Sequence, residues 1–464
     1  MKKLNNKLKL YATVAMSTVV LLSACNKGLE ELDPINTSVP QNPIVGSVAQ
    51  VIASNPNDSL FYKLLVRSTL LPLLNDTNKR FTIFAVDNAG MKIFVNAATG
   101  GAVPLNAPDA TFVGFINNSL PVASAVGIIQ YNTIGQQYLS GSWANAIPNL
   151  PLPSQIQLDP INTPFLRMTI CPSINNGINY VNNIPVFNPA IQASASNGVV
   201  HHSYTIAAPP TKLLKDLIST DTALVFFRAA VARGDSGSVG TSKLDSLLGF
   251  GVLNMTVLAP NNAAMRTAID SLIYPNVYSQ VYAQVYPVVY QNVYNAAIAL
   301  MLTPAQATAF ATANSPAIAA TNSLPIAHSN STALASSPTT FSLLPVSAVK
   351  GLLAYHFLAS NSSGSIKPDI RFFSVNSPTT PKFIKTLVNG SLAAHPGINA
   401  VATFAGPTPT SVKLTGFGIL KEGWGSTIPV NPAPYTGAAA NVIAADRHGV
   451  NGVYHIIDRV LLPQ

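Results

Sequence analysis

Two short segments of this chain each occur twice, and in the same order. FTIFAVDNAGM, at residues 81–91, returns as MTVLAPNNAAM at residues 255–265. NGVVHHSYTIAAP, which begins at Asn197, returns as NGVYHIIDRVLLP, which begins at Asn451. Each first segment has the composition of a short strand and stops at an Asx residue that can cap a following helix. The duplication predicts two tandem domains of the same fold.

The closing segments and the regions before the opening segments complete the pattern. Asn-Gly before a β-branched run is a strong hairpin signal, so residues 441–447 are expected to be the strand that enters the second hairpin. Pro209 and Pro463 end the copies, where proline halts ladder pairing. Apolar residues at spacings of three and four predict helices over Ile44–Thr69 and Lys212–Arg233. Helices and strands grouped in this way predict an α+β fold.

The second copy resembles the fasciclin domain family. It carries in order an opening box MTVLAPNNAAM, a middle Tyr355-His356 and a closing box NGVYHIIDRVLLP, across about residues 212–464. The resemblance implies two tandem fasciclin-like domains, each a β-wedge or sheet packed with helices. It also implies binding to other proteins, matrix or polysaccharide, with no cofactor and no reaction. The family's Tyr-His box has been linked to adhesion, which carries over to Tyr355 and His356 only.

The first copy, at residues 43–210, departs from the family pattern. Val86 and Asp87 stand where the opening box has Pro and Asn. We expect Phe115-Ile116 in place of Tyr-His, and residues 203–205 replace the Ile-Asp-Arg of the closing box. The opening and closing boxes keep their order and the Asn-Gly-Val turn, so the same fold is predicted there.

The second copy is longer by about 80 residues, which form a predicted insertion at about 274–340. Tyrosine recurs every fourth residue from Tyr274 to Tyr294, with valine just before it from residue 277 onward. On a helix this row would drift by about 40° per step and break near Pro287, whereas on a strand it would occupy one face. Both alternatives stay open. The Ala/Thr/Ser-rich residues 305–340 are expected to be partly flexible.

The tyrosine row has two interpretations. Aromatic side chains at helical spacing commonly pack against their own domain. Alternatively, the row is a docking surface for a glycan or a partner protein, because an exposed tyrosine offers a flat apolar face and a hydroxyl. The candidate binding residues are Tyr278, Tyr282, Tyr286 and Tyr290, together with Tyr355 and His356.

The first 24 residues read as a signal peptide. Four lysines precede a short apolar run from Tyr11 to Leu22, and Ser-Ala-Cys25 follows. Leu22–Cys25 resembles a bacterial lipobox, which implies lipidation of Cys25. The alternative is an ordinary signal peptide with a cysteine near its cleavage site. Two or three acyl chains would anchor the protein, and residues 25–42 would be its tether, with charges that resemble a Bacteroidetes-type surface-sorting signal.

Composition narrows the function further. Charged residues make up 9% of the chain, far below the usual quarter or so, and the basic ones are scattered. Nucleic-acid binding needs a concentrated basic stripe, so it is not expected. With Cys25 acylated, Cys171 has no partner, which argues against a disulfide scaffold. Many amides and hydroxyls suit an extracellular surface.

Catalysis is not expected. Glutamate occurs only at 30, 31 and 422, and no HExxH, GxSxG, phosphate loop or Cys/His metal spacing appears. His201 and His202 are adjacent, so on a strand they point to opposite faces. His356 and His455 are expected to bond to the backbone. Asp458 is expected to pair with a neighbouring element.

The predicted organisation is a signal peptide (1–24), a lipidated tether (25–42), a degenerate domain (43–210) and a second domain (211–464). The leading hypothesis is a non-enzymatic outer-membrane lipoprotein, facing the cell surface or the periplasm, that binds extracellular protein or polysaccharide. A second hypothesis is an accessory glycan-capture lipoprotein of an outer-membrane polysaccharide uptake system. A third is a purely structural envelope protein. No cofactor, metal site or nucleic-acid partner is predicted.

Overall fold

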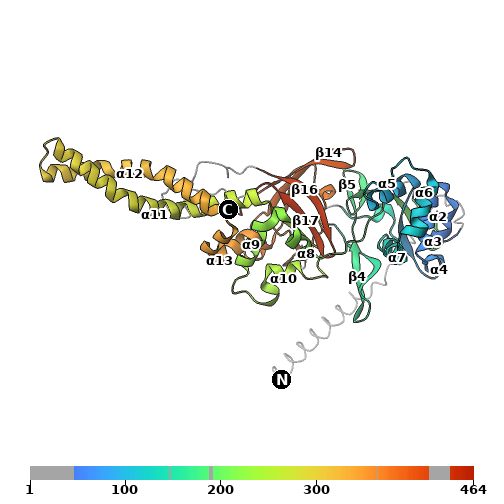
Figure 1. Cartoon of the computed structure of the whole chain (residues 1–464). Coiled ribbons are helices and arrows are strands. Elements are labelled where there is room, and N and C mark those ends of the chain that lie inside the picture. The colour runs from blue at the N-terminus through green and yellow to red at the C-terminus, as the bar shows by residue number, and fades with distance from the viewer. Residues whose placement is uncertain are drawn as a thin grey trace, which may run out of the picture. The chain divides into compact units, whose positions relative to one another are not determined.

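The computed structural model describes residues 46–463 apart from 146, 148, 188–191, 363 and 417–438. Residues Gly46–Gln464 form one compact unit. The predicted signal peptide, the lipidation of Cys25 and the tether lie outside the described residues. Within this unit the described helices and strands fall into two halves that follow one another along the sequence (Figure 1).

The first half holds a six-stranded sheet in the order β4-β3-β2-β1-β9-β8 and a three-stranded sheet, β5-β6-β7. Its helices are α2 (Val48–Ser54), α3 (Ser59–Arg67), α4 (Leu71–Asn75), α5 (Asn88–Ala98), α6 (Asp109–Gly114) and α7 (Val122–Tyr131). Its strands are β1 (Phe81–Val86), β2 (Thr133–Ile134), β3 (Leu152–Asp159), β4 (Thr163–Ile170), β5 (Pro172–Asn175), β6 (Ile178–Val181), β7 (Ile184–Pro185), β8 (Ala193–Ala195) and β9 (Gly198–Ser203).

The second half holds a six-stranded sheet in the order β10-β17-β16-β15-β14-β13 and a two-stranded sheet, β11-β12. Its helices are α8 (Leu214–Thr220), α9 (Val225–Gly234), α10 (Leu244–Leu248), α11 (Asn262–Ala299), α12 (Pro304–Ala335) and α13 (Val346–Ala354). Its strands are β10 (Met255–Pro260), β11 (Ser360–Ser362), β12 (Ser365–Lys367), β13 (Lys382–Ile384), β14 (Ile398–Ala405), β15 (Thr408–Thr415), β16 (Ala440–Gly449) and β17 (Gly452–Ile457). The α+β prediction is confirmed, and so is the hairpin of β16 and β17.

The duplicated sequence segments form the same strand pair in each half. The opening strand β1 lies parallel to the closing strand β9, with Phe81 opposite Gly198. The opening strand β10 lies parallel to β17 in the same register, with Met255 opposite Gly452. A third strand then pairs antiparallel to each closing strand. The repeated sequence therefore encodes a repeated three-strand unit.

The asparagine that starts each closing segment fixes the helices that precede the sheet. The Asn197 side chain accepts from the Val48 N–H at 2.8 Å and donates to the carbonyls of Leu74, in α4, and Asp76, just after it. The Asn451 side chain accepts from the Leu214 N–H at 2.8 Å and donates to the carbonyls of Leu248 and Phe250. Both asparagines are fully buried. Each one joins the first helix of its half to the turn before the opening strand.

Glycine follows each of these asparagines because the opposite strand leaves no room for a side chain. A Cβ at Gly198 would lie 1.9 Å from the Phe81 carbonyl oxygen, and one at Gly452 would lie 2.1 Å from that of Met255. No other residue fits such a close backbone approach without moving the strand. The Asn-Gly pair therefore serves the parallel strand contact as well as the hairpin.

Each opening strand ends at the predicted helix cap. The Asp87 carboxylate accepts from the Gly90 N–H at 2.7 Å and begins α5. The Asn261 side chain accepts from the Ala264 N–H at 2.8 Å and begins α11. Both cap bonds satisfy an otherwise unpaired amide of the first helical turn.

The predicted insertion is two long helices, α11 and α12, which lie side by side (Figure 1). The open question of helix or strand for the tyrosine row is thus answered as helix. Two expectations were wrong. Helix α11 runs through Pro287, which is exposed, so the carbonyl that loses its partner can face water. Residues 305–335 are not a loose tract but lie within α12.

A row of small side chains explains why α12 forms. Every fourth residue of this helix is buried, and all of these residues are alanine or serine: Ala307, Ala311, Ser315, Ala319, Ser323, Ala327, Ser331 and Ala335. A four-residue row drifts on a straight helix, so it stays in contact with a partner only if the two helices wind around each other in a right-handed sense. The valine and tyrosine rows of α11 have the same spacing. The matching rows hold the hairpin together.

Among the described residues, no single helix is long and apolar enough to cross a membrane. One bent pair, Asp109–Ser119 with Val122–Tyr131, meets the length and composition requirement when taken together.

Candidate binding surface

The boxed Tyr355 and His356 lie at the end of α13 and are fully buried. The Tyr355 hydroxyl donates to the Gly397 carbonyl at 2.7 Å, and its ring meets His395 edge-on. His356 contacts the Leu352 carbonyl through Nδ1 and accepts the Leu461 N–H through Nε2, both at 2.9 Å. Burial lowers the pKa of His356 to about 4. The neutral His356 ring thus links α13 to the backbone at Leu461.

The first copy places a different pair at this position. The Leu258 N–H donates to the His356 carbonyl, and the equivalent Phe84 N–H donates to the Asn132 carbonyl. The Asn132 side chain bonds to Ile128 and Ala207, which correspond to the partners of His356. The pair Tyr131-Asn132 therefore takes the place of Tyr-His, and the expectation of Phe115-Ile116 was wrong. An asparagine amide reaches the same two backbone sites as an imidazole.

The other box histidines are also used internally. His201 contacts the Tyr138 carbonyl at 2.9 Å, and His455 contacts the Phe372 carbonyl at 2.8 Å. Burial lowers the pKa of His201 to about 4. His202 faces the other way and meets Asp58 at 2.8 Å, as the strand alternation predicts. The Asp458 carboxylate accepts two bonds, from the Asn441 N–H and its side chain.

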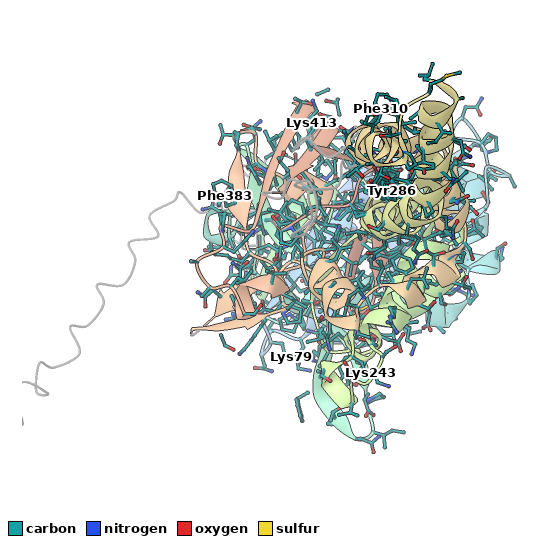
Figure 2. All side chains as sticks on the ribbon, turned by 90° about the vertical axis from the view of Figure 1, so that its left-hand side faces the viewer. Lys79, Lys243, Tyr286, Phe310, Phe383 and Lys413 are labelled. Carbon is teal, nitrogen blue, oxygen red and sulfur yellow. The ribbon has the colours of Figure 1, made fainter. Side chains whose placement is uncertain are left out.

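The tyrosine row lies along α11 (Figure 2 labels Tyr286). Tyr274 and Tyr278 are buried in the core at the base of the helix, and burial raises the pKa of each. Tyr282, Tyr286 and Tyr290 are partly exposed. Successive rings from Tyr274 to Tyr290 have centroids 5.7–6.2 Å apart. The row is therefore a packed base that continues into a partly exposed aromatic surface.

The structure does not bring the two sets of predicted binding residues together. Tyr278 belongs to the core cluster around α8, α9 and β10, whereas Tyr355 belongs to the cluster around β14 and β15. Tyr355 and His356 could meet a ligand only if α13 moved, because their polar atoms are bonded inside the protein. Tyr282, Tyr286 and Tyr290 need no such movement. The exposed part of α11 is the better candidate surface.

Sequence reasoning missed a cavity of about 520 Å³ between α8, α9 and α10. Its polar lining includes Lys215, Arg228, Lys243, Asp235 and Asp245. Lys215 pairs with Asp245 at 2.6 Å, and Asp235 accepts the first two amides of α10. These charges come from three helices and the residues at their ends, and no sequence motif links them.

A buried arginine between the halves was also missed. Arg371 is fully buried and donates to the carbonyls of Thr169 and Val450. Its guanidinium also meets His448 Nε2 at 3.1 Å. Burial and then the neighbouring cation hold the pKa of His448 well below its usual value. A neutral His448 can accept this hydrogen bond, so the cluster joins the two halves without a carboxylate.

Over the described part of the chain, no group of three His, Cys, Asp or Glu side chains could hold a metal ion.

No protein-family model matches this chain, and no curated protein matches its sequence. Among solved structures, the chain is similar to a FAS1 domain pair from the insect cell adhesion molecule fasciclin I. The identity is 12%, the match covers 87% of this chain and 96% of that chain, and the TM-score is 0.28.

Proposed function

We propose that this chain is a non-enzymatic envelope lipoprotein with two fasciclin-like domains that binds an extracellular protein, matrix or polysaccharide. The fasciclin boxes of the sequence support the family, and the two halves use those boxes in equivalent bonds. Thr82 and Thr256 illustrate the equivalence. The Thr82 hydroxyl donates to the Gln136 carbonyl and accepts from the Tyr138 N–H. The Thr256 hydroxyl donates to the Ile370 carbonyl and accepts from the Phe372 N–H in the same pattern. Arg67 and Arg233 likewise each cap a single carbonyl.

One observation favours binding through the second domain. The polar groups of the boxes bond inside the protein, whereas α11 offers partly exposed tyrosines. From residue 271 to residue 349 the chain has no Lys, Arg, Asp or Glu. Stacked tyrosines combine apolar area with hydroxyl groups and lose little side-chain entropy on binding. We infer that the α11–α12 hairpin, defined as residues 273–332, carries the contact surface.

The test replaces this hairpin with its short counterpart from the first copy. Leu120 and Leu344 accept equivalent arginine bonds, and Asp87 and Asn261 are equivalent caps. Residues 99–108 therefore correspond to residues 273–332 and provide a loop of known fit. The full chain and this graft are compared on a glycan array and on extracellular-matrix proteins. Because the graft also removes the buried Tyr274 and Tyr278, its fold is checked by circular dichroism and urea unfolding. We expect the folded graft to lose binding at least about tenfold.

Equal binding by the full chain and the folded graft would remove the hairpin from the proposal. Binding by neither protein to any glycan or matrix protein would count against adhesion altogether. Binding confined to glycans would favour the glycan-capture hypothesis.

The lipid anchor has its own test. A Cys25→Ser variant should lose incorporation of labelled fatty acid and leave the membrane fraction. Unchanged labelling of this variant would contradict lipidation at Cys25. Protease treatment of intact cells then distinguishes a surface-facing chain, which is cut, from a periplasmic one, which is protected.

A further inference from the structure

The turn between α11 and α12 presents the most exposed apolar side chains of the hairpin. Leu300 is 74% exposed and Met301 is 94% exposed. Ile298, just before the turn, and Phe310, on the second turn of α12, are also exposed (Figure 2 labels Phe310). The turn lies at the end of the two paired helices (Figure 1). Four exposed apolar side chains thus lie at the turn or within two helical turns of it.

Met301 occupies a backbone position that favours glycine. Its φ is 62°, in the left-handed region, which side chains other than glycine adopt at a cost. The turn is a Schellman motif, in which Leu302 donates to Ala297 and Met301 donates to Ile298. Glycine is the usual residue at this point of the motif. A strained residue with an exposed side chain suggests that the side chain itself has a use.

The amide donors of the turn are hydrogen-bonded within the protein. The Leu300, Met301 and Leu302 amides all donate within the turn. Thr303 begins α12 with a capping box, in which its side chain accepts from the Gln306 amide and Gln306 accepts the Thr303 amide. Bonded amides lower the cost of moving this turn toward an apolar medium, and the turn carbonyls can stay hydrated in the interfacial region.

The turn can enter an apolar medium without carrying a charged side chain out of water. Between Ser271 and Val349 the chain has no Lys, Arg, Asp or Glu. Another exposed apolar hairpin provides a contrast. Ile161 and Phe165, at the turn of β3 and β4, are 87% and 80% exposed but lie close in sequence to Asp159 and Arg167. Exposure alone therefore does not distinguish the turn of the α11–α12 hairpin, whereas lack of charge does.

We propose that the turn of the α11–α12 hairpin inserts into the interfacial region of a lipid bilayer, with Leu300 and Met301 deepest. Apolar side chains that enter the acyl boundary while the rest of the hairpin stays outside give shallow, reversible binding. Tyrosines farther along α11 suit the headgroup level, because each has an apolar ring and a polar tip. Since the hairpin lacks charge, binding should not require anionic lipid.

The test reports on the turn itself, within the full chain carrying Cys25→Ser. Met301→Cys carries an environment-sensitive NBD dye, and a second protein carries the same dye at Ile161→Cys as the matched control. Each is mixed with phosphatidylcholine vesicles, with or without nitroxide on the acyl chains. We expect NBD at 301 to brighten at least about twofold and to be quenched by the acyl nitroxide. NBD at 161 should do neither.

An unchanged signal at 301, or equal responses at 301 and 161, would overturn the proposal. Brightening at 301 that acyl nitroxide does not quench would also overturn it, because the dye would then lie against protein. A second pair of proteins guards against misfolding: Met301→Gly suits the turn geometry and should weaken vesicle flotation, and Leu300→Asp should reduce it at least about tenfold. Flotation equal to that of the parent chain, with the helical circular dichroism retained, would contradict insertion.

Discussion

The helix that follows the opening strand differs most between the two halves. In the first half α5 has 11 residues, whereas in the second half α11 has 38 residues and continues into α12. Both helices begin at an Asx cap in the same position after equivalent strands. The framework is therefore held constant by strand pairing and buried polar bonds, and the residues beyond the first turns of this helix are free to vary.

The sheets also extend on different sides of the shared strands. Beyond the opening strand the first half adds β2, β3 and β4, whereas the second half adds β15, β14 and β13 beyond β16. Where the first half pairs β1 with β2, the second half has an isolated antiparallel bridge between Val257 and Phe357. The shared unit is thus smaller than a whole domain: two parallel strands, one antiparallel neighbour and the helices that they bind.

The largest expected effect tests whether both halves depend on the close strand approach. Gly452→Ala places a Cβ 2.1 Å from a carbonyl oxygen, and Gly198→Ala places one at 1.9 Å. Each should lower the free energy of unfolding by about 4 kcal/mol or more, measured by urea unfolding. Gly351→Ala is the control, since its Cβ meets nothing within 4 Å in α13 and should stabilise by up to about 1 kcal/mol. A small loss of unfolding free energy in Gly198→Ala would show that the two halves do not depend equally on the close strand approach.

Acid should destabilise both halves through their buried histidines. The folded pKa of His201 and of His356 is about 4, against about 6.5 in the unfolded chain. Between these values the unfolded chain binds more protons, so stability is complete above pH 6.5 and falls as pH drops toward 4. The loss is about 3 kcal/mol per histidine.

A substitution borrowed from the first copy isolates one histidine. His356→Asn copies Asn132, whose amide makes the equivalent bonds. This variant should stay folded at pH 7 and lose less stability than the parent between pH 6.5 and pH 4, as urea unfolding would measure. An unchanged acid slope would show that His356 is not protonated on unfolding.

Loss of the buried asparagine hub should cost less than the glycine clash. Asn451→Ala removes three side-chain bonds and leaves the Leu214 amide and the Leu248 carbonyl without these partners, which should cost about 2–4 kcal/mol. Asn451→Asp keeps the acceptor for Leu214 but loses both donors. Asn197→Ala should lose a similar amount of unfolding free energy in the first half. A cost in only one half, measured by urea unfolding, would mean that the copies are not held in the same way.

The smallest effect belongs to the hairpin alone. Ser323→Leu overfills a buried position of the small-residue row and should destabilise the α11–α12 pair by about 1–3 kcal/mol. Asn322→Leu, at the exposed neighbouring position, should change little. Amide hydrogen exchange should then speed up in residues 273–332 and stay unchanged in the first half. Faster exchange in the first half would show that the hairpin and the framework unfold together.

The part of the fold that could be predicted rests on short-range patterns. The strand that ends at Asp87 or Asn261, the cap that follows it and the Asn-Gly before β9 or β17 each depend on residues within one turn of each other. The candidate surface was only partly predictable. The spacing of Tyr282, Tyr286 and Tyr290 indicated an aromatic row. The exposure of Leu300 and Met301 depends instead on where α11 ends and turns back into α12, which no sequence pattern indicated.

The sequence alone thus determined that one framework occurs twice and where its caps and hairpins lie, because those features are local and chemically specific. Only the tertiary structure decided that Asn132 substitutes for His356, since two different side chains can satisfy the same pair of backbone groups. It also decided that the tyrosine row is helical. A four-residue period stays on one face of a helix only when a partner winds with it, and the buried alanine and serine row of α12 provides that partner.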